Sequence, residues 1–231
     1  MEKFINKKIE EITQLISENR IDKAELLTKK FSEEYAEIDI PHNIMGIIMQ
    51  KKNKFEESTL YFQKAIKINK NFLSAHINLG IAYQILEKNS EAIKSFRKAL
   101  EINPNLFEIQ NNIGGILLRM DKTEEAIRYI KKSILINKNY EKAYYTLGQA
   151  FEKLTKTNKA IENYKKSINI NSKFYESYFS LGEIYRKKDD HLKALDFYLK
   201  SKNPKTNIRI LECYLALNLI EKFNDKLNEL K

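Results

Sequence analysis

Few residues in this chain could do acid–base or metal chemistry. It has three histidines, His42, His76 and His191, and its only cysteine is Cys213. Histidine is the side chain that most often moves protons in catalysis. However, His42 and His76 lie 34 residues apart at one position of a repeated pattern, so we interpret both as packing residues. Neighbouring helices lie about 10 Å apart, which is too far for these two imidazoles to share a zinc ion. We expect His191 in a turn before a helix.

The other patterns that could carry chemistry are also missing. Gly114-Gly115 lies inside a predicted helix and does not form a phosphate-binding loop. Gly115 would open the surface locally or simply be tolerated there. Cys213 lies in an apolar helical stretch with no base nearby in sequence, which favours a buried structural thiol. We therefore expect a chain that is not an enzyme and holds no cofactor and no metal.

Composition bounds the class of protein. The chain has 231 residues and a net charge of +10, from 41 Lys and Arg against 31 Asp and Glu. Six glycines and three prolines are too few for the turns of an all-β fold. Lysine far outnumbers arginine, and without clustering this excess does not predict nucleic-acid binding. No apolar run approaches the roughly 18 residues that span a membrane, and the N-terminus lacks the apolar core of a secretory signal. We expect a cytoplasmic chain that does not enter the membrane.

A 34-residue repeat organises the sequence. One series of small residues is Gly46, Gly80, Gly114, Gly148 and Gly182. A second is Ala24, Ser58, Ala92, Ala126, Ala160 and Ala194, and bulky residues follow it by four, at Phe62, Phe96, Ile130, Tyr164 and Tyr198. Apolar spacings of three and four predict helices. The small residues let two antiparallel helices cross closely, while the bulky ones fill space toward the next pair.

The residues 75–83, Ala-His-Ile-Asn-Leu-Gly-Ile-Ala-Tyr, are followed by Glu91-Ala92-Ile93, Phe96, Lys98-Ala99-Leu100 and Asn103-Pro104-Asn105. This block resembles a tetratricopeptide repeat, a 34-residue helix-turn-helix. The resemblance implies an all-α fold, a right-handed α-solenoid of antiparallel helix pairs. The family's proline near the end of the second helix is present only as Pro104, so we expect the other second helices to end less sharply.

The repeat phase also predicts the domain organisation. We expect a single domain over 1–231, because no linker separates the units. It begins with a degenerate repeat at 1–38, in which Ile12 takes the glycine position. The full repeats are expected at 39–72, 73–106, 107–140, 141–174 and 175–208. Capping helices are expected within 205–231, one running from Pro204 through Leu217 and another from Leu219 to Leu230, because repeat arrays need a polar terminal face.

The resemblance also implies where a partner binds. In this family the concave face, formed by the first helices, holds extended or helical peptides. The helical phase assigns to it Asn43, Ile47, Ile77, Asn78, Ile81, Asn111, Asn112, Tyr145, Gln149 and Phe179. Asn78 and Asn112 hold equivalent positions and could align their carboxamides along a peptide backbone. We expect Ile47, Ile77 and Ile81 to be exposed. In an empty groove each would then lack the burial free energy of about 1.5 to 3 kcal/mol that a buried aliphatic side chain contributes. The alternative that neighbouring helices or the terminal segment cover this strip stays open.

The function that follows is a non-catalytic scaffold or adaptor that binds a protein or peptide segment. Two alternatives are the recruiting arm of a larger glycosyltransferase, sulfotransferase or oxygenase, and a self-assembling structural subunit. A chaperone partner of the carboxylate-clamp type is not expected, because Ile47 and Glu108 stand where the clamp needs other residues. An outward lysine series could meet acidic partners or simply be solvated: Lys64, Lys98, Lys132, Lys166 and Lys200. The sequence predicts neither the oligomeric state nor the partner.

Overall fold

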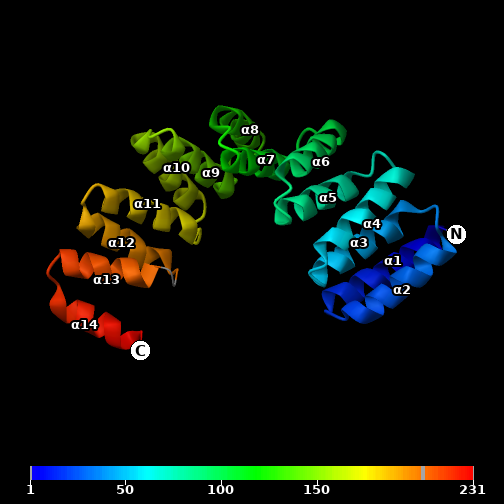
Figure 1. Ribbon diagram of the computed structural model, residues 1–231, viewed down its shortest axis with the longest axis horizontal. Helices are drawn as coiled ribbons and strands as arrows, with labels where there is room; N and C mark the ends of the chain where they lie inside the picture. Colours follow the sequence, from blue (N-terminus) through cyan, green and yellow to red (C-terminus); the bar gives the residue numbers. More distant parts are fainter. Residues whose placement is uncertain (1, 204–205, 231) are drawn as a thin grey trace. The chain divides into compact units, whose positions relative to one another are not determined.

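A computed structural model describes residues 2–203 and 206–230 of the chain. Over these residues it contains fourteen α-helices and no strand, which confirms the all-α expectation (Figure 1). The helices are α1 (Glu2–Ser17), α2 (Ile21–Glu34), α3 (Asp39–Lys51), α4 (Phe55–Ile68), α5 (Leu73–Ile85), α6 (Asn89–Ile102), α7 (Phe107–Arg119), α8 (Thr123–Ile136), α9 (Glu141–Lys153), α10 (Thr157–Ile170), α11 (Tyr175–Lys187), α12 (His191–Ser201), α13 (Thr206–Ala216) and α14 (Ile220–Glu229).

Contacts group the chain into two compact units, Met1–Ile109 and Gln110–Lys231. In the first unit each helix from α1 to α6 packs against the next one along the chain, and α3 also contacts α5. In the second unit the same order of neighbours runs from α8 to α14. Helices that contact mainly their sequence neighbours are typical of repeat architectures. That the whole chain forms one domain stays a prediction.

The glycine series marks the place where the two helices of a pair cross. A Cβ atom built on Gly148 would lie 2.6 Å from the ring of Tyr164, far inside van der Waals contact. Gly46, Gly80, Gly114 and Gly182 meet the equivalent bulky residue of their own pair in the same way. The close crossing expected from the sequence is therefore present. Each glycine leaves room for the residue that lies 16 positions after it.

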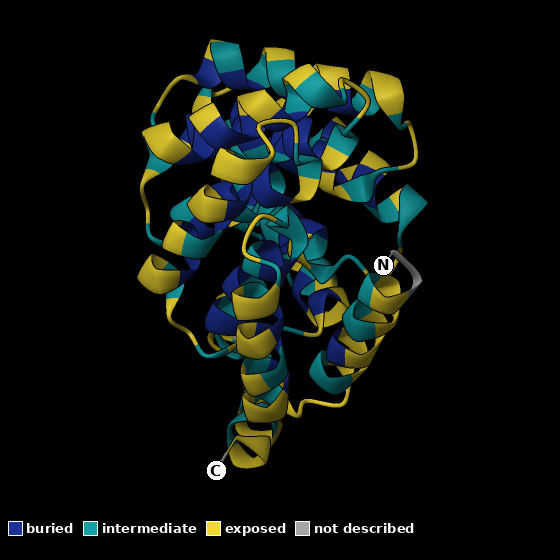
Figure 2. Cartoon of the chain, turned by 90° about the vertical axis from the view of Figure 1, so that its right-hand side faces the viewer, coloured by how far each residue is buried: buried dark blue, intermediate teal, exposed yellow. Residues whose placement is uncertain are grey.

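The bulky residues also fill the space toward the following pair, as expected. Phe62 of α4 packs with Leu79 and Ala82 of α5. Tyr164 of α10 packs with Leu181 and Ile184 of α11. The helices accordingly carry buried residues on one side and exposed residues on the other (Figure 2). One side chain therefore closes a pair internally and joins it to the next pair.

The turn after each first helix contains a residue with left-handed backbone conformation, which the sequence pattern did not predict. The backbone φ is positive at equivalent places 34 residues apart: Asn19, Asn53, Glu87, Asp121, Thr155 and Asp189. The following residue returns a hydrogen bond to the last turn; for example, the Lys156 N–H donates to the Phe151 carbonyl over 2.8 Å. This is the Schellman arrangement, in which glycine is usually found. The chain uses it to reverse direction in each pair.

Thr155 is the least suitable of these residues, because a β-branched side chain at φ 54° is strained. We expect Thr155→Gly to raise the free energy of unfolding by about 1 kcal/mol, since relief of that strain exceeds the entropy cost of glycine. Urea denaturation measures this change. Asn53→Gly is the matched control and should change little, because asparagine tolerates this conformation. A lower midpoint for Thr155→Gly than for the wild type would contradict the assignment of strain.

The second helices end sharply, contrary to our expectation from the missing prolines. They end at Ile68, Ile102, Ile136 and Ile170, all in one phase. The next residue in each case is an asparagine whose Oδ1 accepts the N–H two residues on, over 2.9 to 3.1 Å: Asn69, Asn103, Asn137 and Asn171. An Asx turn of this kind offers the backbone an alternative to helix. After Ile68, Ile136 and Ile170 it fixes the helix end without proline.

The terminal pairs follow the same plan in a looser form. Ile12 of α1 is fully buried, in the cluster that also holds Phe31 of α2 and Met45 of α3. At the other end α13 packs on α12, and Cys213 is fully buried there, which confirms the structural thiol. Burial raises the pKa of that thiol. Pro204, expected to start the first capping helix, lies outside the described residues, as do 1, 205 and 231.

Candidate partner-binding surface

The histidines are held by their own surroundings. His76 is buried, and its Nε2 lies 2.9 Å from the Lys70 carbonyl oxygen. His42 is half-buried, and its Nε2 lies 3.4 Å from the Ala36 carbonyl oxygen. His191 begins α12. In the described ranges no three His, Cys, Asp or Glu side chains gather as a metal site would require. The packing interpretation of His42 and His76 agrees with these contacts.

Asparagines of successive helix pairs meet within the first unit, while the expected alignment of Asn78 with Asn112 stays a prediction. In the first unit the Asn78 amide donates to the Asn43 Oδ1 over 3.0 Å. Asn43 is buried and Asn78 half-buried. Asn43 therefore supports α5 from α3, and Asn78 presents the remainder of its amide on the first-helix face. In the second unit Asn111 is buried and Asn112 half-buried.

Exposed isoleucines lie on α5. Ile81 is 36% exposed and Ile85 49% exposed. The expected exposure of Ile47 and Ile77 was wrong, because both are half-buried. Ile47 packs against the cluster of Phe62, Leu79 and Ala82, so its burial is provided by the fold itself. The apolar strip of the first unit consequently reduces to Ile81 and Ile85.

A hollow of about 380 Å³ lies between α7 and α9 in the second unit. It is lined by Gly115, Leu118, Arg119, Thr146, Gln149 and Lys153. A Cβ atom on Gly115 would meet nothing within 4 Å, so this glycine leaves open space, one of the two outcomes considered from the sequence. The uncharged polar side chains, Thr146 and Gln149, come from α9, where the exposed Gln149 donates to the Tyr145 hydroxyl over 3.1 Å.

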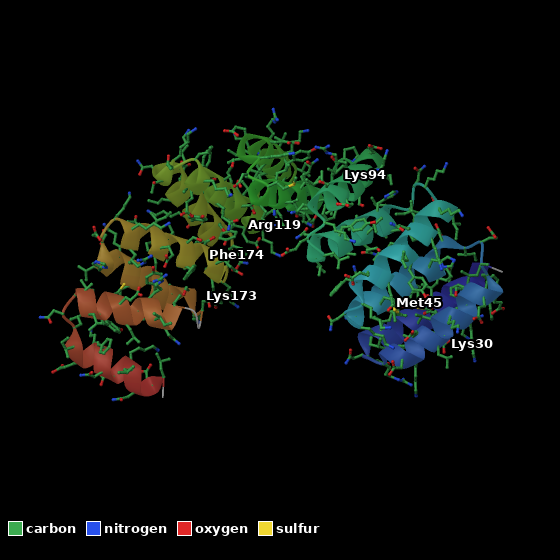
Figure 3. All side chains as sticks on the ribbon, viewed as in Figure 1. Lys30, Met45, Lys94, Arg119, Lys173 and Phe174 are labelled. Atoms are coloured by element: carbon green, nitrogen blue, oxygen red, sulfur yellow. The ribbon has the colours of Figure 1, made fainter. Side chains whose placement is uncertain are left out.

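Two cations lie at the edge of this hollow. Lys153 forms an ion pair with Asp121, the left-handed residue after α7. Arg119 is exposed at the end of α7 and is labelled in Figure 3. An arginine fork recognises carboxylate groups well. The hollow therefore combines free space, amide groups and positive charge on one face of two neighbouring helices.

The aromatic residues assigned to this face are largely used in packing. Tyr145 lies against Tyr164 and Phe174, with ring centroids 5.7 and 5.3 Å apart, and burial raises the pKa of its hydroxyl. Phe179 lies against Tyr198 at 6.1 Å. Both rings are half-buried. Packing within the fold therefore uses part of each ring.

Comparison with protein families explains the repeat. Models described as tetratricopeptide repeat match residues 74–106, 107–140, 141–174 and 175–203, more than half of the chain. The chain belongs to the tetratricopeptide repeat family. Members of this family are in general non-catalytic modules for protein interaction. The chain is thus an α-solenoid of tetratricopeptide type and, in general terms, a protein-interaction scaffold.

Solved structures give the same fold. The structure titled "Crystal structure of MamA" has 27% sequence identity and a TM-score of 0.61, over 68% of this chain and 92% of that one. PilF of Pseudomonas aeruginosa has 18% identity and a TM-score of 0.71, over 84% and 90%. YrrB, titled a TPR protein with an unusual peptide-binding site, has 20% identity and a TM-score of 0.62, over 84% and 97%. A comparison with curated proteins found no match.

In this tetratricopeptide chain the lysine series lies on the outer surface, as expected, since all five lysines are exposed. Three of them pair along their own helix: Lys98 with Glu101 over 2.6 Å, Lys166 with Glu162 over 2.7 Å and Lys200 with Asp196 over 2.7 Å. Exposed pairs of this kind contribute little to stability, because solvent screens them. These pairings favour the solvated interpretation of the series.

Among the described helices none is long and apolar enough to cross a membrane.

A polar cluster in the last repeats was missed from the sequence. Glu183 of α11 accepts the Tyr198 hydroxyl over 2.6 Å, and pairs with Arg186 and, on α13, Arg209, each over 3.0 Å. Burial alone would raise the pKa of Glu183, but the hydrogen bonds from Arg186 and Tyr198 outweigh it and lower that pKa. For Tyr198, burial and the bond to Glu183 raise the hydroxyl pKa. The sequence signal was an acid and an arginine three residues apart on one helix, Glu183 and Arg186.

Proposed function

We propose that this chain is a non-catalytic scaffold whose first-helix face holds an extended segment of a partner protein. The observation that carries the proposal is the hollow beside Gly115, because it offers space at a helix surface that the fold leaves unfilled. Gln149 retains amide groups for a peptide backbone, and Arg119 favours a segment with carboxylates, whereas Lys153 is already paired with Asp121. In the first unit Asn78 and the exposed Ile81 and Ile85 form a second, more apolar contact region.

A scaffold explains why the polar groups on this face differ from an active site. A catalytic site needs titratable groups within hydrogen-bond reach of one another and of the substrate. Here the lining combines an amide, a threonine whose hydroxyl donates to the Lys142 carbonyl, and two cations. Such a set can bind and orient a peptide. We also propose the cytoplasm as the place where the chain works.

Peptide phage display against the whole chain tests the proposal. We expect selected peptides to lose binding by about tenfold or more on Gly115→Trp, because the indole fills the hollow and one tenfold change equals about 1.4 kcal/mol. Asn78→Ala with Ile81→Asp tests the contact region of the first unit in the same way. Lys131→Ala, on the exposed side of α8, is the control and should bind as the wild type does. Peptides that bind all variants equally would reject this face as the site.

A further inference from the structure

The first unit carries a second groove, between the second helices α4 and α6, with side chains of α5 in its lining. Two adjoining hollows, of about 700 and 470 Å³, lie between α4 and α6 and share Ile66, Lys70, His76 and Lys98 in their lining. We propose that this groove is a second interaction surface, which binds an acidic amphipathic segment of another protein. It lies on residues that the first-helix face does not use, so it is independent of the function proposed above.

The floor of the groove is apolar. Leu79 and Tyr83 of α5 form it together with Ile66 of α4. The Gln63 amide donates to the Tyr83 hydroxyl over 2.7 Å and so satisfies the polar tip of that ring. The ring and the two aliphatic chains can therefore take up apolar side chains without stranding a polar group. An apolar floor between two helices suits the apolar side of a helix or strand.

The rim of the groove is mainly positive. Lys67, Lys70 and Lys94 are exposed, and within the described chain none of these three ammonium groups lies in an ion pair. Lys94 lies on α6 and is labelled in Figure 3. Lys98 is neutralised by Glu101 over 2.6 Å. Because the three lysines form no ion pair among the described residues, charge complementarity selects an acidic occupant.

His76 explains why the space exists here. It stands at the fourth position of its repeat, where the later repeats carry the larger Tyr144 and Tyr178. The bond between His76 Nε2 and the Lys70 carbonyl oxygen holds the imidazole against the wall of the groove. A tyrosine at this position would extend into the hollow. The smaller residue therefore leaves the groove open without disturbing the helix pairing.

The occupant that this lining favours is a protein segment and not a nucleic acid. Phosphate binding gains from continuous positive charge along the backbone. Here Glu91 and Glu101 interrupt the rim, and the floor offers aliphatic carbon to the ligand. A segment with leucine on one side and glutamate on the other matches both the floor and the three lysines. A segment without both patterns would match either the apolar floor or the three lysines, but not both.

A designed peptide is the probe for this surface. We use a labelled helix-forming peptide with leucine on one side and glutamate on the other, and measure its Kd for the whole chain by fluorescence anisotropy. Replacing Lys67, Lys70 and Lys94 together by glutamate should weaken binding by about tenfold or more, and added salt should weaken it in the wild type. His76→Tyr should weaken it by a similar factor through loss of space, and the fold should persist because the later repeats carry tyrosine there.

The controls distinguish binding in the groove from a general effect of net charge. Lys131, Lys132 and Lys165, exposed on α8 and α10, replaced together by glutamate change the net charge equally and should leave the Kd unchanged. Gly115→Trp should also leave it unchanged, which keeps this test apart from that of the first-helix face. Equal affinity for a lysine-for-glutamate version of the peptide, an unchanged Kd in both groove variants, or tighter binding of a DNA or RNA oligonucleotide to the same lysines would overturn the proposal.

Discussion

Gly148→Ala should lower the free energy of unfolding by about 2 kcal/mol, although alanine is the better helix former. The added methyl would lie 2.6 Å from the ring of Tyr164, and overpacking of this kind costs about 1 to 3 kcal/mol or more. Tyr164 cannot move aside easily, because it is fully buried and its hydroxyl donates to Glu152. This cost exceeds the gain of about 1 kcal/mol that alanine brings to a helix interior.

Urea denaturation followed by circular dichroism measures the change. Hydrogen exchange should place the loss of protection in α9, α10 and the helices that they contact, since repeat proteins can open locally. The matched control is Gly115→Ala, which adds the same methyl inside a helix where nothing lies within 4 Å. It should stabilise the chain by about 0.4 to 1 kcal/mol. If both substitutions shift the midpoint in the same direction, the close crossing at Gly148 does not control stability.

Glu183→Gln is expected to cost about 2 kcal/mol, because it leaves Arg186 facing a neutral amide in a half-buried cluster, while Arg209 keeps only its pair with Glu212 on α13. The Glu183 side chain is only 18% exposed, so solvent screens its charge less than it screens a surface pair. The loss should appear mainly as weaker docking of α13, which carries Arg209. Asp196→Asn, the same kind of change in an exposed pair on α12, should cost less than about 0.5 kcal/mol.

The pH dependence gives this prediction a second test. The folded chain lowers the pKa of Glu183, so its contribution is present above the unfolded value of about 4.3 and is lost as the pH falls through the folded value. The difference in unfolding free energy between the wild type and Glu183→Gln should therefore be largest near neutral pH and shrink in acid. A difference that stays constant down to low pH would show that packing, not charge, explains the variant.

The sequence predicted most of the fold because its strongest pattern is a packing pattern. A glycine and a bulky residue 16 positions later contact each other in one helix pair, so they recur together and their phase is readable. Sequence reasoning failed where conformation depends on a single residue in a turn. Positive φ at Glu87 or Thr155 has no glycine to reveal it, and the Asx turns at Asn69 and its equivalents were hidden among many asparagines.

The candidate site could be predicted only in part, because helical phase shows on which side of a helix a residue lies but not how far it is buried. Asn43 and Asn111 were assigned to the first-helix face yet are buried, and Asn43 is bound there by Asn78 of the neighbouring first helix α5. Tyr145 and Phe179 were correctly recognised as large residues near that side, but each is held by a tyrosine from a second helix. Gly115 and Arg119 became informative only when the helices on either side of the hollow were in place.

The contact between each glycine and its bulky residue has a consequence for how such a chain can change in length. Both members lie within one stretch of 34 residues, so a duplication or deletion of a whole stretch carries them together. The Asx turn that ends the second helix lies within the same stretch. Gain or loss of one unit therefore leaves every internal crossing intact, and only the two newly adjoining surfaces have to adapt. Arrays of this kind can therefore evolve by gain or loss of whole units before any side chain changes.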